Sequence, residues 1–216
     1  MREFVTNEWF TVFLILAFIC VVIAKSLNAL RFNDFIFVIG NSKYLKIYSR
    51  DQKFVDIFDG FLFVNFAVSL SIFIYLAYSN YIQTLSFDLI TFLKISFAIA
   101  TILIIKVLVE RLVASLFEID AIIDTYLFQK TTFKNYSGLI LLISNVFLLY
   151  TVIPKNIVII ATIGLICLIN LIGFFSSFKT YQNLIYVNIF YFLLYLCALE
   201  IGPYIILYKV IRDYNV

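Results

Sequence analysis

The chain has 216 residues and a net charge of +3, and 64% of it is hydrophobic, 19% aromatic and only 13% charged. Soluble domains usually carry about 25% charged residues, so this composition excludes an ordinary soluble domain. Two prolines and six glycines are too few for the turns of a β-barrel, and the apolar residues form continuous runs. The sequence therefore predicts an all-α, polytopic membrane protein with about six transmembrane helices.

The first apolar run covers residues 9–24 and is followed by Lys25. A secretory signal peptide has a basic start, a shorter apolar core and a small-x-small cleavage site. Here the acidic Glu3 and Glu8 precede a long run. We therefore expect an uncleaved first helix, with Trp9 as an aromatic anchor at the membrane interface.

Residues 25–59 are rich in charge, but aromatic and aliphatic side chains lie between the charged ones. One interpretation is a loop on the lipid headgroups, where rings dip into the membrane and basic groups meet anionic lipids. The other is a docking surface for a second protein. The two are compatible, and both membrane lipids and other membrane proteins are expected partners.

Residues 61–78 form the second predicted span, and residues 89–108 form the third, which is interrupted by Lys94 and Lys106. Residues 109–130 contain no proline or glycine, and their apolar positions recur at intervals of three and four. The third helix is therefore predicted to continue as a cytoplasmic extension over residues 109–130. Its apolar stripe requires a partner surface, and the candidate contact residues are Leu112, Leu116 and Phe117.

The fourth and fifth predicted spans, residues 139–153 and 157–175, are joined at Pro154-Lys155-Asn156. Such a short link predicts an antiparallel helical hairpin. The sixth predicted span, residues 184–208, is interrupted by Glu200, Gly202 and Pro203. Because Pro203 lacks a backbone donor, the sequence predicts a helix kink at Gly202 and Pro203.

Charged groups at membrane depth cost a few kcal/mol or more, so Lys94 and Glu200 need an explanation. Counting residues from the span ends places both at about 6 to 9 Å below the outer hydrocarbon boundary. The structural interpretation is that they snorkel to the headgroups or pair with each other. The functional interpretation is a proton or ion relay through Glu200. The structural one is favoured, because a transport pathway normally contains several such groups.

The distribution of basic residues predicts the orientation. With the N-terminus outside, the inner segments hold ten basic residues: Lys25, Arg31, Lys43, Lys46, Arg50, Lys53, Arg111, Lys130, Lys134 and Lys179. The outer segments hold four: Arg2, Lys155, Lys209 and Arg212. This bias predicts a multi-pass protein with both termini on the extracytoplasmic side of the membrane.

The segment FYFLLYLCALEIGP, residues 190–203, resembles the closing motif of an uncharacterised bacterial family of about this length. That family is known only as a domain of unknown function and is predicted to be integral to the inner membrane. The resemblance implies a membrane location and no known activity. It places Glu200 and Pro203 inside the motif without giving either residue a role.

Nothing in the sequence resembles an active site. Histidine is absent, and Cys20, Cys167 and Cys197 lie in apolar runs without metal-ligand spacing, so no enzyme activity, cofactor or metal site is expected. No basic patch suggests a nucleic-acid partner. The leading hypothesis is a non-enzymatic subunit of a larger envelope assembly, for example in protein export or secretion. The alternative is a small proton-coupled transporter or channel that uses Glu200 and Lys94.

Overall fold

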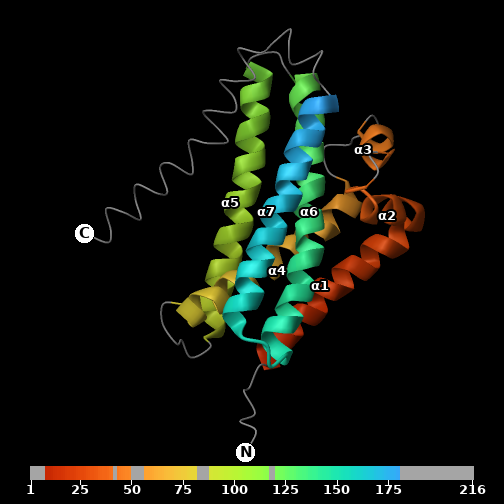
Figure 1. The fold of residues 1–216 in the computed structure, drawn as a ribbon. Helices are drawn as coiled ribbons and strands as arrows, with labels where there is room; N and C mark the ends of the chain where they lie inside the picture. The colour runs from red at the N-terminus through yellow and green to blue at the C-terminus, as the bar shows by residue number, and fades with distance from the viewer. Residues whose placement is uncertain (1–7, 41–42, 50–55, 82–87, 117–119, 181–216) are drawn as a thin grey trace, which may run out of the picture.

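A computed structural model describes residues 8–40, 43–49, 56–81, 88–116 and 120–180 (Figure 1). This part of the chain is all-α, and its helices are α1 (Glu8–Leu27), α2 (Ala29–Ile36), α3 (Lys43–Tyr48), α4 (Ile57–Tyr81), α5 (Leu89–Leu116), α6 (Asp120–Tyr150) and α7 (Lys155–Thr180). Five helices in it, α1, α4, α5, α6 and α7, are long and apolar enough to cross a membrane. The all-α prediction is confirmed for these residues, and the five apolar helices are compatible with a multi-pass membrane protein. The sixth predicted span, residues 184–208, lies outside the described residues.

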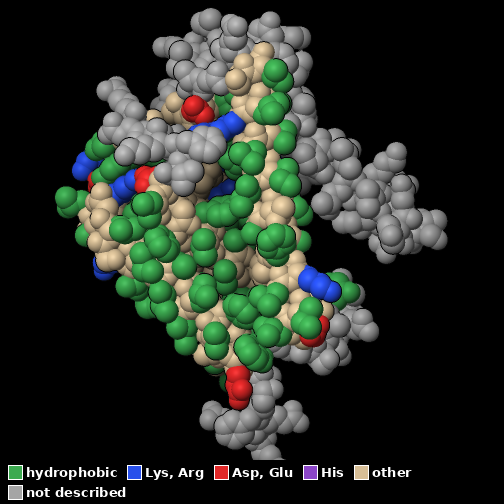
Figure 2. Space-filling model, turned by 180° about the vertical axis from the view of Figure 1, so that it is seen from behind, with side chains coloured by type: hydrophobic (Ala, Val, Ile, Leu, Met, Phe, Trp, Pro, Cys, Tyr) green, Lys and Arg blue, Asp and Glu red, His purple; other side chains and the backbone are tan. Residues whose placement is uncertain are grey.

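The long helices alternate in direction (Figure 1). The start of α1, the end of α4 and the α6–α7 turn share one end of the bundle: Thr11 bonds to Tyr150 there, and Asn80 bonds to Asn156. α4 packs against both α1 and α6, and α6 also packs against α7, whereas α5 contacts its neighbours over a small area. Hydrophobic side chains cover most of the face seen in Figure 2, and charged side chains gather towards its ends.

The α4–α6 interface contains small and polar residues among its large apolar side chains. The amide of Asn145 donates to the Ser69 carbonyl oxygen at 2.8 Å, and that of Asn135 donates to the Asp59 carbonyl oxygen at 3.4 Å. At Gly138 an added Cβ would lie 2.9 Å from the Cα of Phe66. Small residues at such crossings let membrane helices approach closely, and side-chain hydrogen bonds then join them.

The structure differs from the expected single helix over residues 109–130. α5 ends at Leu116, and residues from Asp120 onwards belong to α6. Lys130 Nζ lies 2.6 Å from Glu110 Oε1, although twenty residues of straight helix would separate them by about 30 Å. The chain therefore reverses between the two helices. Helical periodicity continues through both, which is why the sequence pattern does not reveal the reversal.

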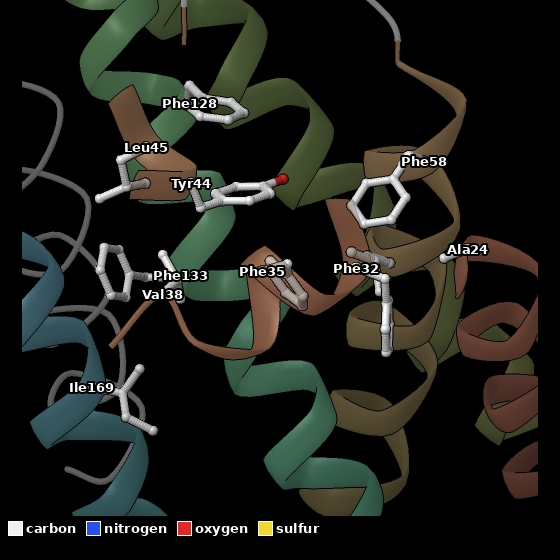
Figure 3. Packing of buried hydrophobic residues seen from close by; sticks show 11 residues of the cluster. Ala24, Phe32, Phe35, Val38, Tyr44, Leu45, Phe58, Phe128, Phe133 and Ile169 are labelled. Atoms are coloured by element: carbon white, nitrogen blue, oxygen red, sulfur yellow. The ribbon is translucent and has the colours of Figure 1, made fainter. Parts of the chain in front are cut away.

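The segment between α1 and α4 folds against the bundle as α2 and α3. Asn28 caps α2, since its side chain accepts a hydrogen bond from the Arg31 amide at 3.0 Å. Phe32, Phe35 and Tyr44 are buried in a core cluster with residues of α4, α6 and α7. In Figure 3 Tyr44 lies beside Phe128 with nearly parallel rings, and Phe32, Phe35 and Phe58 group next to it. These rings were expected to face headgroups or a partner, and they lie in the interior instead.

Candidate functional site

Arg31 holds the α2–α3 segment, here called the cap, onto the start of α4. Its guanidinium forms ion pairs with Asp56 and with Asp59, the latter at 2.8 Å. The Arg31 and Asp59 side chains are largely buried, whereas Asp56 is about one-third exposed. A planar guanidinium suits two carboxylates because its donors point in fixed directions. The cap is therefore fixed by a charged network as well as by apolar packing.

Aromatic rings enclose this network. The guanidinium carbon of Arg31 lies 4.5 Å from the Phe58 ring centre and 5.1 Å from that of Tyr48, both within cation–π range. Burial raises the pKa of the Tyr44 phenol, so Tyr44 stays neutral at physiological pH. Burial alone would lower the pKa of Arg31, but its neighbours Tyr44, Asp59 and Asp56 raise that pKa on balance. The arrangement keeps one permanent positive charge between two carboxylates and is structural in character.

A second ionic cluster joins α5 to α6. Glu110 is 1% exposed, and its Oε1 lies 2.6 Å from Lys130 Nζ and 4.0 Å from Lys106 Nζ. Arg111 Nε lies 3.3 Å from Asp124 Oδ1 on the same hairpin. Because removing one member of a buried ion pair leaves an uncompensated charge, these contacts oppose separation of the two helices. They hold the end of α5 and the start of α6 together as one unit, called the tip hairpin below.

The outer side of the tip hairpin carries exposed apolar residues. Leu112 is 61% exposed and Leu116 is 71% exposed, and Ile105 and Val109 continue the same row along α5. The spacing of these four residues is four, three and four, which is the spacing of a seam that packs against another helix. Of the candidate partner residues predicted from sequence, Leu112 and Leu116 thus lie on one exposed stripe. Phe117 lies outside the described residues.

Of the two residues in the predicted intramembrane pair, only Lys94 lies among the described residues. Lys94 lies on α5 and is exposed. Hydrogen bonds from Thr91, and then from the Ile90 amide, lower the pKa of Asp88 at the helix start, and the charge of Lys94 adds a smaller effect in the same direction. Glu200, Gly202 and Pro203 lie outside the described residues, so the ion pair and the kink stay predictions.

Several residues that organise the structure were not singled out from the sequence. Arg31 was counted only among the basic residues of the inner segments, and Glu110 was given no site role, although each is the centre of a buried network. Asn65, Asn135 and Asn145 are also fully buried. A usable signal existed for Asn65 and Asn145, because an asparagine within an apolar span usually faces another helix.

Residues 10–211 match a protein family described as a domain of unknown function (DUF4271). Searches of the curated proteins and of the solved structures found no match.

Proposed function

The chain belongs to the family described as a domain of unknown function (DUF4271), and because that description names no activity, we propose a function from the geometry. The protein is a non-enzymatic subunit of a larger assembly in the bacterial inner membrane. Its bundle anchors it in the lipid, and its tip hairpin binds a helix of a partner protein. The observation that carries this proposal is the exposed stripe of Ile105, Val109, Leu112 and Leu116 on a hairpin held by ion pairs.

Helix length supports a position of the tip outside the hydrocarbon. α5 has 28 residues, and at about 1.5 Å per residue it is about 42 Å long, whereas the hydrocarbon is about 30 Å thick. The charged residues Lys106, Glu110 and Arg111 lie towards the end of α5, so the excess length belongs at that end. Leu112 and Leu116 then lie beyond the acyl chains. Apolar side chains that lipid does not cover favour a protein contact.

The spacing of the stripe favours a helix as the partner element. A helix presents its own apolar row at intervals of three and four, so two such rows interlock along their length. The basic residues of the tip hairpin, which include Lys106, Arg111 and Lys130, already form ion pairs within it. The contact is therefore proposed to depend on packing of apolar side chains more than on charge.

Photo-crosslinking tests this proposal directly. A crosslinking amino acid placed at Leu116 should join the chain to a second protein in intact cells, and adding Val109→Ser with Leu112→Ser to that chain should abolish the product. Membrane insertion should stay intact, because both positions are exposed. A matched control is Phe175→Ser, which removes another exposed apolar residue, on α7, and should leave the product unchanged.

Three outcomes would contradict the subunit proposal. One is a crosslink that joins Leu116 only to residues 184–208 of the same chain. Another is a product that survives the double serine change. The third is a purified, partner-free protein that carries a proton-linked flux which Glu200→Gln stops, and this result would favour the transporter hypothesis.

The proposed orientation places the tip hairpin and the cap in the cytoplasm and both termini outside. Single cysteines are introduced in a background without Cys20, Cys167 and Cys197. An impermeant maleimide added to intact spheroplasts should label Asn156→Cys and Ser79→Cys, which lie at the same end of the bundle, because Asn156 bonds to Asn80. It should not label Asn33→Cys on α2 until the membrane is opened. Labelling of Asn33→Cys in intact spheroplasts would reverse the orientation.

A further inference from the structure

The cap has an outward face that its internal packing does not use. On α2, Phe32 and Phe35 point into the core cluster, whereas Leu30 is 78% exposed and Phe37, at the end of the helix, is 69% exposed. Successive helical residues are rotated by about 100°, which puts Leu30 and Phe37 on the side opposite to the two buried rings. Leu30 and Phe37, called the apolar row below, therefore face away from the bundle, because the burial of Phe32 and Phe35 fixes the rotation of α2.

Lysines flank this apolar row. Lys25 lies in the last turn of α1, and Lys46 lies on α3, and both are exposed. A third lysine, Lys43, is 58% exposed and lies 3.4 Å from Asp34. Figure 1 shows the end of α1, α2 and α3 on one side of the bundle, and Figure 2 shows basic side chains beside hydrophobic ones in that region. Apolar and basic side chains thus lie beside one another on this part of the surface.

The position of the cap relative to the apolar spans indicates which class of ligand fits its outward face. α1 and α4 are both apolar spans, and the cap joins the end of one to the start of the other. It therefore lies where the hydrocarbon gives way to the headgroups. A surface with apolar and basic residues at that level matches an anionic phospholipid, whose acyl chains meet the apolar groups and whose phosphate meets the ammonium groups. We infer that the outward face of the cap is a binding surface for anionic phospholipid of the adjacent leaflet.

The buried Arg31 network gives this surface a fixed shape. Arg31 holds the cap to Asp56 and Asp59, and the N-cap at Asn28 fixes the direction in which α2 leaves α1. The backbone that carries the lysines does not need to be ordered when lipid binds, because their helices are already in place. Pre-organisation of this kind raises affinity by reducing the entropy lost on binding.

The test compares two lipids on the purified full chain in mild detergent. Added phosphatidylglycerol should raise the thermal unfolding temperature more than phosphatidylcholine at equal concentration. Lys25→Gln with Lys46→Gln should lower the apparent affinity for phosphatidylglycerol about twenty-fivefold, since each lysine near an anionic surface contributes about a fivefold factor. The matched control, Lys94→Gln with Lys155→Gln, removes the same charge outside the cap and should keep the difference between the lipids.

A fluorescence measurement tests the contact without relying on stability. The chain has one tryptophan, so Leu30→Trp in a Trp9→Phe background reports on the cap alone. Phosphatidylglycerol that carries a quencher near its headgroup should quench this residue more than the corresponding phosphatidylcholine, and high salt should remove the difference. Equal quenching by the two lipids, or a lipid preference unchanged in the Lys25 and Lys46 variant, would overturn the inference. Release of a bound acidic protein by that variant, with no change in lipid preference, would overturn it as well.

Discussion

Replacing Gly138 with leucine is expected to separate α4 from α6 and to prevent formation of a stable bundle. An added Cβ at this position would lie 2.9 Å from both the Cα and the Cβ of Phe66 and 3.0 Å from the Asn65 amide nitrogen. Because two of these contacts are made by the helix backbone and its first side-chain atom, no simple rotamer change relieves them. Overpacking a well-packed core typically costs 1 to 3 kcal/mol, and we expect Gly138→Leu to cost about 3 kcal/mol or more.

The measurement is the unfolding temperature in mild detergent, followed by size-exclusion chromatography after heating. Gly138→Ala should give a smaller loss in the same direction. Gly164 is the matched control, because a Cβ there meets nothing within 4 Å, and Gly164→Ala should leave stability unchanged or raise it slightly. Equal behaviour of the two alanine variants would show that the close approach at Gly138 does not determine the packing.

Replacing Arg31 with methionine is expected to release the cap and to destabilise the bundle by about 3 to 5 kcal/mol. The change leaves Asp59 without its buried counter-charge and removes the cation over the Phe58 ring. Asp56 is about one-third exposed, so solvent screens its ion pair with Arg31. The expected loss of stability therefore lies towards the lower end of that range. The loss can be measured as the fall in thermal unfolding temperature, together with protease cleavage between α1 and α4.

Two further variants separate charge from packing. Adding Asp56→Asn and Asp59→Asn to Arg31→Met should recover much of the stability, because the unpaired carboxylates are then absent. Lys43→Met breaks an exposed ion pair with Asp34 and should cost less than about 1 kcal/mol. If the triple variant is no more stable than Arg31→Met alone, the charged network does not hold the cap.

Hydropathy was sufficient to identify the class of protein, because each apolar helix is a continuous run. The first run was predicted over residues 9–24 and α1 covers Glu8–Leu27, and the fifth was predicted over residues 157–175 and α7 covers Lys155–Thr180. α6 was not anticipated as one helix, since its first turns were predicted as part of the third helix, over residues 109–130. Hydropathy identifies the parts of a helix that lipid covers, but it does not show how far the helix continues outside the membrane.

The candidate site was harder to predict because its contacts join residues distant in sequence. Arg31 is separated from Asp56 and Asp59 by 25 and 28 residues, and no periodicity relates them. Glu110 meets Lys130 only because the chain reverses between α5 and α6. The stripe at Leu112 and Leu116 was predictable, because it depends on the spacing within one helix. The spacing of residues within one helix can be read from the sequence, whereas ion pairs between distant residues can be predicted only when the topology of the fold is known.

The polar interface between α4 and α6 also affects how the protein is made. α4 ends at Tyr81 and α6 ends at Tyr150, so about 70 residues are synthesised after α4 before its partner is complete. At about 5 to 20 residues per second, this interval lasts roughly 3 to 14 seconds. During that time Asn65 and Ser69 of the nascent α4 lack the helix that later packs on them. These polar groups of α4 therefore reach their final partners only after α6 has been synthesised.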